Sequence, residues 1–166
     1  MSAQPAYEPH THTEAPATPV AREPVGGILI RIVLTLAGAA GLIIGGFMNW
    51  TGGANGTDLS YRAFYRPVFV DGSFFTTVGV VMIGLGLVAL LGAAPRTGIL
   101  TSFAGVLGIA GFTLFVIQLG RADRPLPASI DAGAWVALAG AIVALAAGFF
   151  GRRQVVVTGT RPVAVG

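Results

Sequence analysis

The sequence contains no cysteine and no lysine, and only 10% of its 166 residues are charged. The absence of cysteine excludes disulfides, thiol nucleophiles and thiolate metal sites. The scarcity of charge excludes an ordinary water-soluble domain, whose surface usually carries about 25% charged residues. Because 54% of the residues are hydrophobic, the surface of this protein is expected to face lipid.

Four apolar runs are long enough to cross a membrane as helices. About 20 helical residues span the roughly 30 Å hydrocarbon core of a bilayer. The sequence therefore predicts an all-α bundle of four transmembrane helices, at residues 28–48, 74–94, 98–119 and 133–150. Arg31 lies one turn inside the first run, and its long side chain is expected to return the guanidinium to the headgroups.

Two polar tails flank this transmembrane domain of residues 28–151. Residues 1–27 hold five prolines without apolar periodicity, which predicts a disordered tail, and residues 152–166 form the C-terminal tail. With both tails in the cytoplasm, six arginines lie inside and four outside, as the positive-inside rule prefers. The exclusive use of arginine and the abundance of alanine and glycine indicate a high-GC bacterium, and hence its inner, plasma membrane.

Small residues at helical spacing are expected to hold the helices together. Lipid is as apolar as leucine, so close backbone approach at small residues drives helix packing in membranes. Two interpretations stay open: the bundle uses every such stripe internally, or a stripe on the first or fourth helix docks a partner helix. The predicted packing residues are Ala37, Gly41, Gly45, Gly79, Gly86, Gly108, Gly140, Ala144 and Gly148.

Residues 49–73 form a predicted outer loop that is rich in aromatic residues. Its glycine pairs mark a turn, after which Thr57 or Asp58 is expected to cap a short helix over residues 59–65 that Pro67 ends. On this helix three aromatic residues would share one face and two arginines another. Such a helix suits the membrane interface, with rings at headgroup depth and guanidinium groups near phosphates.

The outer loop is also where specific binding is expected. Asp58 precedes Arg62 by four residues, the favourable order for an ion pair, and Asp123 of the second outer loop could pair with Arg62 as a lid. Trp50, Phe74 and Phe75 would extend the aromatic belt at the helix ends. Either the segment is a passive anchor, or it recognises an anionic lipid or a partner protein. The candidate binding residues are Trp50, Asp58, Tyr61, Arg62, Phe64, Tyr65 and Arg66.

Residues typical of catalysis or ion coupling are missing from the predicted helices. Coupled transporters usually place ionisable residues near the middle of the membrane, and these runs carry none there. His10 and His12, the only histidines, lie in the first tail without supporting metal ligands. The sequence therefore predicts no catalytic residue, no cofactor, no metal and no nucleic-acid partner.

Three functions remain open on these grounds. The first is a non-catalytic accessory or scaffold protein, bound to a partner within a larger bacterial membrane assembly. The second is a small oligomeric transporter or channel, whose pore glycine, threonine and Gln118 would line. The third is an envelope-lipid enzyme in which Asp58, Arg62 and Arg66 hold a phosphate.

The chain resembles the small four-helix integral membrane proteins of uncharacterised function that are common in actinobacteria. The resemblance covers residues 28–153 and is carried by Asn49-Trp50, directly after the first helix, and by the aromatic segment 61–67. In outline the chain is also similar to the claudin-type four-helix proteins of eukaryotes, but it lacks their loop cysteines. Neither resemblance implies a catalytic residue.

Overall fold

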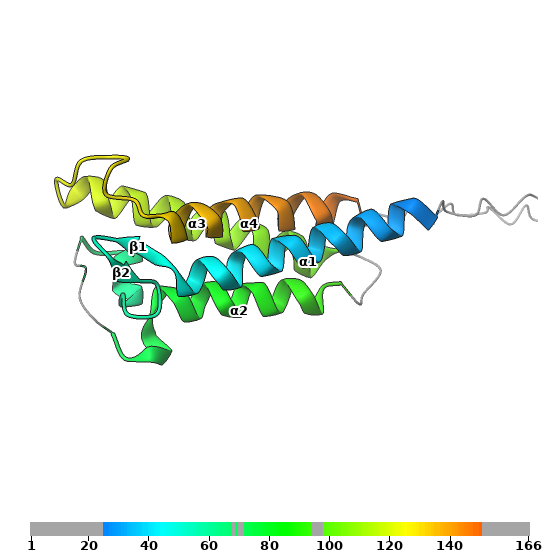
Figure 1. The fold of residues 1–166 in the computed structure, drawn as a ribbon, viewed down its shortest axis with the longest axis horizontal. Helices are drawn as coiled ribbons and strands as arrows, with labels where there is room; N and C mark the ends of the chain where they lie inside the picture. Colours follow the sequence, from blue (N-terminus) through cyan, green and yellow to red (C-terminus); the bar gives the residue numbers. More distant parts are fainter. Residues whose placement is uncertain (1–24, 68, 70–71, 94–97, 151–166) are drawn as a thin grey trace, which may run out of the picture.

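The computed structural model describes residues 25–67, 69, 72–93 and 98–150. Its four α-helices are α1 (Val25–Phe47), α2 (Val78–Leu91), α3 (Ile99–Arg121) and α4 (Ala132–Phe149). They run side by side as one bundle, which confirms the predicted all-α class (Figure 1). The first residue of α1 and the last of α4 lie at the same end of this bundle.

Three helices are long and apolar enough to cross a membrane, namely α1 from Leu29, α3 and α4. Contact with a lipid bilayer follows from these spans. The second helix is shorter than predicted, because Phe74–Thr76 forms a separate 3-10 helix, η2, and the Thr77 hydroxyl accepts the Val80 N–H to begin α2. With 14 residues, α2 is about 21 Å long, less than a full hydrocarbon core. Residue 94, the predicted end of this helix, lies outside the described residues.

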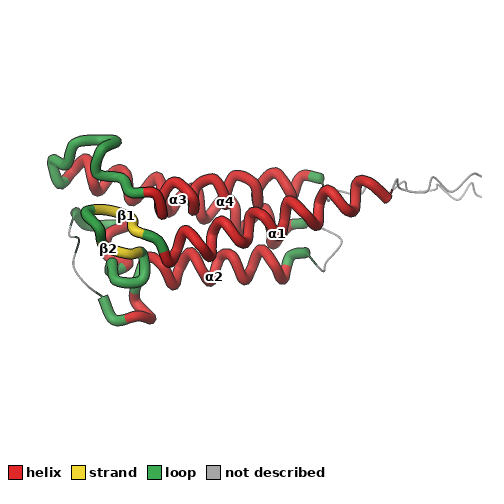
Figure 2. The backbone as a smooth tube through the Cα atoms, in the orientation of Figure 1, coloured by secondary structure: helices red, strands yellow, loops and turns green. Residues whose placement is uncertain are grey.

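The connection between α1 and α2 forms a folded cap at the other end of the bundle. We use "the cap" for the described part of residues 48–77. It begins with two short antiparallel strands, β1 (Asn49–Thr51) and β2 (Ala54–Asn55), which the sequence did not predict (Figure 2). The two-residue turn between them is Gly52-Gly53, whose φ angles of 57° and 79° suit glycine and match the twist of a tight hairpin.

The larger hydrophobic core lies at the cap end of the bundle. Trp50 and Leu59 of the cap are packed there with Phe115 and Leu119 of α3 and with Met82 of α2. A smaller cluster, made of alanines from α1, α2 and α3, packs the helices elsewhere. Because the large side chains gather under the cap, the fold of the cap and the fold of the helices stabilise each other.

Glycines bring α1 and α4 into backbone contact. A Cβ atom added to Gly41 would lie 2.7 Å from the Gly140 Cα atom, and one added to Gly38 would lie 2.6 Å from the Ala144 backbone nitrogen. These distances are too short for any side chain, so the two helix axes could not stay this close with larger residues. The predicted stripe of α4 therefore packs inside the bundle.

One of the predicted packing residues lies elsewhere. Ala37 is exposed. Gly38 occupies the contact position against α4 that the four-residue spacing had assigned to Ala37. The error arises because adjacent residues of a helix point about 100° apart, so a shift of one position moves a residue off the contact face. The other predicted residues face a neighbouring helix: Gly45 lies against Ala137, Gly79 against Gly46, Gly86 against Ala39, Gly108 against Ala141 and Gly148 against Ser102.

Candidate binding surface on the cap

Trp50 is completely buried beneath the hairpin. Its indole Nε1–H donates a hydrogen bond of 2.8 Å to the Gly45 carbonyl oxygen, and its ring packs edge-on against Phe115 at 5.1 Å. The prediction that Trp50 belongs to a lipid-facing belt is therefore wrong. The chain turns back over the end of α1 after this residue, and Gly56 provides the room, because a Cβ atom there would lie 2.9 Å from Nε1.

Main-chain hydrogen bonds fix the cap to the start of α2 and to α1. The Gly56 N–H donates to the Met48 carbonyl at 2.9 Å, and the Gly56 carbonyl accepts the Gly79 N–H at 2.7 Å. The Leu59 carbonyl accepts the Val78 N–H at 2.8 Å. These bonds satisfy backbone groups at a helix start and within the loop, so the cap is an ordered part of the fold.

The segment between α3 and α4 also contacts the cap. The Gly53 N–H donates to Asp131 Oδ2 at 3.1 Å, and the Asp131 N–H donates to the Trp50 carbonyl at 2.9 Å. Arg124 donates to Thr51 Oγ1 at 3.4 Å and places its guanidinium 5.0 Å from the Phe69 ring centre. The predicted contact between the two loops exists, but Arg124 and Asp131 make it in place of Asp123.

The predicted helix over residues 59–65 is shorter and differently capped. The structure has a 3-10 helix, η1 (Tyr61–Phe64), whose first turn is capped by the Ser60 hydroxyl instead of Thr57 or Asp58. The Asp58 carboxylate accepts a hydrogen bond from the Asn55 amide at 3.0 Å, and no ion pair joins it to Arg62 in the described part of the chain. The ion-pair prediction assumed α-helical spacing, which this segment does not have.

One side of η1 faces the bundle. Ala63 is buried, and the half-buried Phe64 ring lies over Gly111 of α3. The Gln118 side chain, also buried, donates from Nε2 to the Phe64 carbonyl at 3.5 Å, while its Oε1 atom has no partner among the described residues. Phe64 is thus part of the support for η1, and it does not share an exposed face with the two tyrosines.

The other side of η1 is exposed and combines tyrosine with arginine. The rings of Tyr61 and Tyr65 lie 5.9 Å apart, and the Arg66 guanidinium lies 5.9 Å from the centre of the Tyr65 ring. Arg62 is exposed beside them. We name these four residues the Tyr–Arg patch. It contains four of the seven candidate binding residues that the sequence indicated. The packing of Ala63 and Phe64 against the bundle holds this surface in place.

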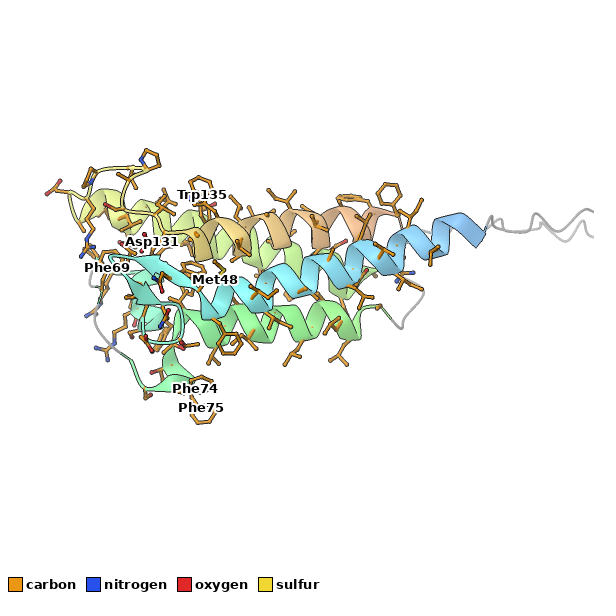
Figure 3. The ribbon with its side chains drawn as sticks, viewed as in Figure 1. Met48, Phe69, Phe74, Phe75, Asp131 and Trp135 are labelled. Atoms are coloured by element: carbon orange, nitrogen blue, oxygen red, sulfur yellow. The ribbon has the colours of Figure 1, made fainter. Side chains whose placement is uncertain are left out.

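A shallow hollow lies on another part of the cap end. It has a volume of about 380 Å³ and is lined by Met48, Asn49, Asp131 and Ala132, at the start of α4 (Figure 3). The hollow is widely open, and its one carboxylate already accepts the Gly53 N–H. In the described part of the chain, no three histidine or acidic side chains are grouped to hold a metal ion. His10 and His12 lie outside the described residues.

Comparisons with family models, with curated proteins and with solved structures find no match to this chain. The resemblance to small actinobacterial four-helix proteins therefore stays a prediction.

Proposed function

We propose that this protein is a non-catalytic accessory or scaffold subunit of a larger bacterial membrane assembly. In this proposal all four helices cross the plasma membrane, both termini are cytoplasmic, and the cap lies outside. The six-to-four distribution of arginines supports this orientation. The Tyr–Arg patch is then the surface that binds the external domain of a partner protein.

The carrying observation is that an ordered cap leaves the Tyr–Arg patch exposed. Ala63 and Phe64 attach η1 to the bundle, while Tyr61 and Tyr65 are 41% and 50% exposed. A surface that is already ordered loses little conformational entropy on binding, which favours affinity. Tyrosine and arginine are also among the residue types that contribute most to protein interfaces.

The chemistry of the patch favours a particular kind of partner surface. Arg62 and Arg66 offer planar guanidinium groups that bind carboxylates with two parallel hydrogen bonds. Tyr61 and Tyr65 offer apolar ring surface with a polar tip. A partner domain that presents acidic residues around an apolar centre would complement both features.

The two other functions have less support. A pore lined by Gln118 needs its side chain to face a water-filled passage, whereas the side chain is buried against Phe64. A phosphate site needs Asp58, Arg62 and Arg66 to converge. Asp58 is instead bonded to Asn55, and Arg66 is stacked on Tyr65. These contacts leave the accessory role as the best-supported proposal.

The test is to purify the tagged protein from its native membrane in mild detergent and to identify the proteins that remain bound. We expect one stoichiometric partner, which is lost from the double variant Arg62→Ala/Arg66→Ala. Arg121→Ala, an exposed arginine at the end of α3, is the matched control and should retain it. A partner that binds both variants equally, or a pure homo-oligomer that conducts solute in liposomes, would overturn the proposal.

A further inference from the structure

Two phenylalanines of η2 project from the side of the molecule. Phe75 is 85% exposed and Phe74 is 53% exposed. Their rings pack edge-to-face against each other at 5.6 Å, and both point away from the bundle (Figure 3). Two large apolar side chains at this exposure are costly in water, so a surrounding medium other than water is implied.

The polar groups next to these rings are satisfied within the same short segment. The Thr76 hydroxyl donates to the Ser73 carbonyl at 2.9 Å, and the Ser73 and Thr76 hydroxyl oxygens lie 2.9 Å apart. The Thr77 hydroxyl donates to the Phe74 carbonyl at 2.8 Å. A segment that enters a low-dielectric medium must satisfy its hydrogen-bonding groups internally, and residues 73–77, which are η2 and its two flanking residues, meet this requirement at all three hydroxyls.

The position of η2 along the bundle coincides with that of another exposed aromatic residue. Figure 3 shows Phe74 and Phe75 on one side of the molecule and Trp135 on the opposite side, at the same level along the helices. Trp135 is 46% exposed and packs at a tilt against Phe112, with the ring centres 5.3 Å apart. Tryptophan is enriched where the hydrocarbon core meets the headgroups. The strands of the cap lie beyond this level, farther from the middle of the helix bundle.

We propose that Phe74 and Phe75 form a wedge that inserts into the bilayer leaflet on the cap side. The wedge lies at the boundary between headgroups and acyl chains, and with Trp135 it fixes the depth of the bundle from two opposite sides. The occupant of this surface is phospholipid. The sequence assigned the interfacial role mainly to the segment that contains η1, with Phe74 and Phe75 as an extension of its aromatic belt, whereas this geometry assigns that role to η2. The inference holds whether or not the Tyr–Arg patch binds a partner.

The absence of cysteine allows a direct depth measurement. A nitroxide label on Phe75→Cys, in liposomes of phosphatidylethanolamine and phosphatidylglycerol, is tested for collisions with oxygen and with a water-soluble nickel chelate. Leu107→Cys, on an exposed face within α3, and Tyr65→Cys, on the cap, are the lipid and water controls. We expect Phe75→Cys to collide with oxygen several-fold more often than Tyr65→Cys does, and less often than Leu107→Cys.

Two other outcomes would overturn the wedge. A label at position 75 that collides with the nickel chelate as often as the Tyr65→Cys label would place η2 in water. A label that neither reagent reaches would show that protein covers the two rings, as a second copy or another subunit would. Unchanged emission from the buried Trp50, measured in a Trp135→Phe background, verifies that each labelled variant is folded.

Discussion

Arg31 donates a hydrogen bond of 3.2 Å to the carbonyl oxygen of Gly92, 61 residues away in the sequence and directly after the last residue of α2. The final carbonyls of a helix have no partner within the helix and carry the negative end of its dipole. A guanidinium at this point therefore satisfies one of these carbonyls and balances the dipole. The hydrogen bond also joins α1, whose apolar run Arg31 interrupts, to the end of α2, which is the shortest of the four α-helices.

Replacing Arg31 should lower the stability of the bundle. We expect Arg31→Ala to lower the free energy of unfolding by about 1–2 kcal/mol, since it removes a charge-assisted hydrogen bond and a favourable dipole interaction. Thermal unfolding in detergent, followed by circular dichroism, measures the change. Leu29→Ala, an exposed neighbour on α1, is the control. Equal melting temperatures for the two variants would show that the bond to Gly92 contributes nothing.

The contact between α1 and α4 predicts a contrast between two neighbouring positions. Gly41→Ile should separate the helices and cost about 3 kcal/mol or more, because the added side chain would collide with the backbone around Gly140. Ala37→Ile, one turn earlier on the same helix, should cost little, because this residue is exposed. The yield of folded protein from detergent extracts and the melting temperature measure the stability cost of each substitution. A large cost for both substitutions would restore the stripe that sequence spacing predicts, in which Ala37 and Gly41 lie on one contact face.

The burial of Trp50 predicts a shielded fluorescence signal. In a Trp135→Phe background the remaining tryptophan should resist quenching by aqueous iodide and by brominated lipids, because its ring is covered by protein. Trp50→Ala should lower the free energy of unfolding by about 3–5 kcal/mol through the cavity it leaves. Efficient quenching by lipid bromine would instead place the ring in the lipid-facing belt that the sequence indicated.

The contact of the second loop with the cap depends on Asp131. Asp131→Ala should speed amide hydrogen exchange across the β1–β2 hairpin, because the Gly53 N–H loses its acceptor. Asp123→Ala, the residue that the sequence favoured for this role, should leave the exchange pattern unchanged. Hydrogen exchange followed by mass spectrometry in detergent distinguishes them. Faster hairpin exchange in the Asp123→Ala variant alone would contradict the observed contacts.

The helices could be predicted from the sequence because hydrocarbon imposes a simple length and polarity rule. Any apolar run of about 20 residues satisfies it, whatever its neighbours are, so α1, α3 and α4 were found at nearly the right positions. The start of α2 was missed because Phe74 and Phe75 are as apolar as the helix that follows. Hydropathy could not show that the Thr77 hydroxyl caps the helix after them.

The cap was harder to predict, because tertiary contacts decide its local structure. Trp50 looks like an interfacial residue by type and position, and only the return of the chain at Gly56 buries it. The spacing of Asp58 and Arg62 implied an α-helix. In the fold, Leu59 is buried, the Asp58 carboxylate accepts a hydrogen bond from Asn55, and a 3-10 helix begins only at Tyr61. Residue types alone did indicate the exposed tyrosines and arginines.

We propose that α2 crosses the membrane despite its length, so that the Tyr–Arg patch would lie on the opposite side from both termini. A single cysteine at Tyr61, and in a second variant a cysteine appended after Gly166, can be probed in intact cells with a maleimide that does not cross membranes. We predict that Tyr61→Cys is labelled in intact cells and that the C-terminal cysteine is labelled only after lysis. Labelling of both cysteines in intact cells, or of neither, would contradict the crossing of the membrane by α2, and labelling of the C-terminal cysteine alone would contradict the proposed orientation.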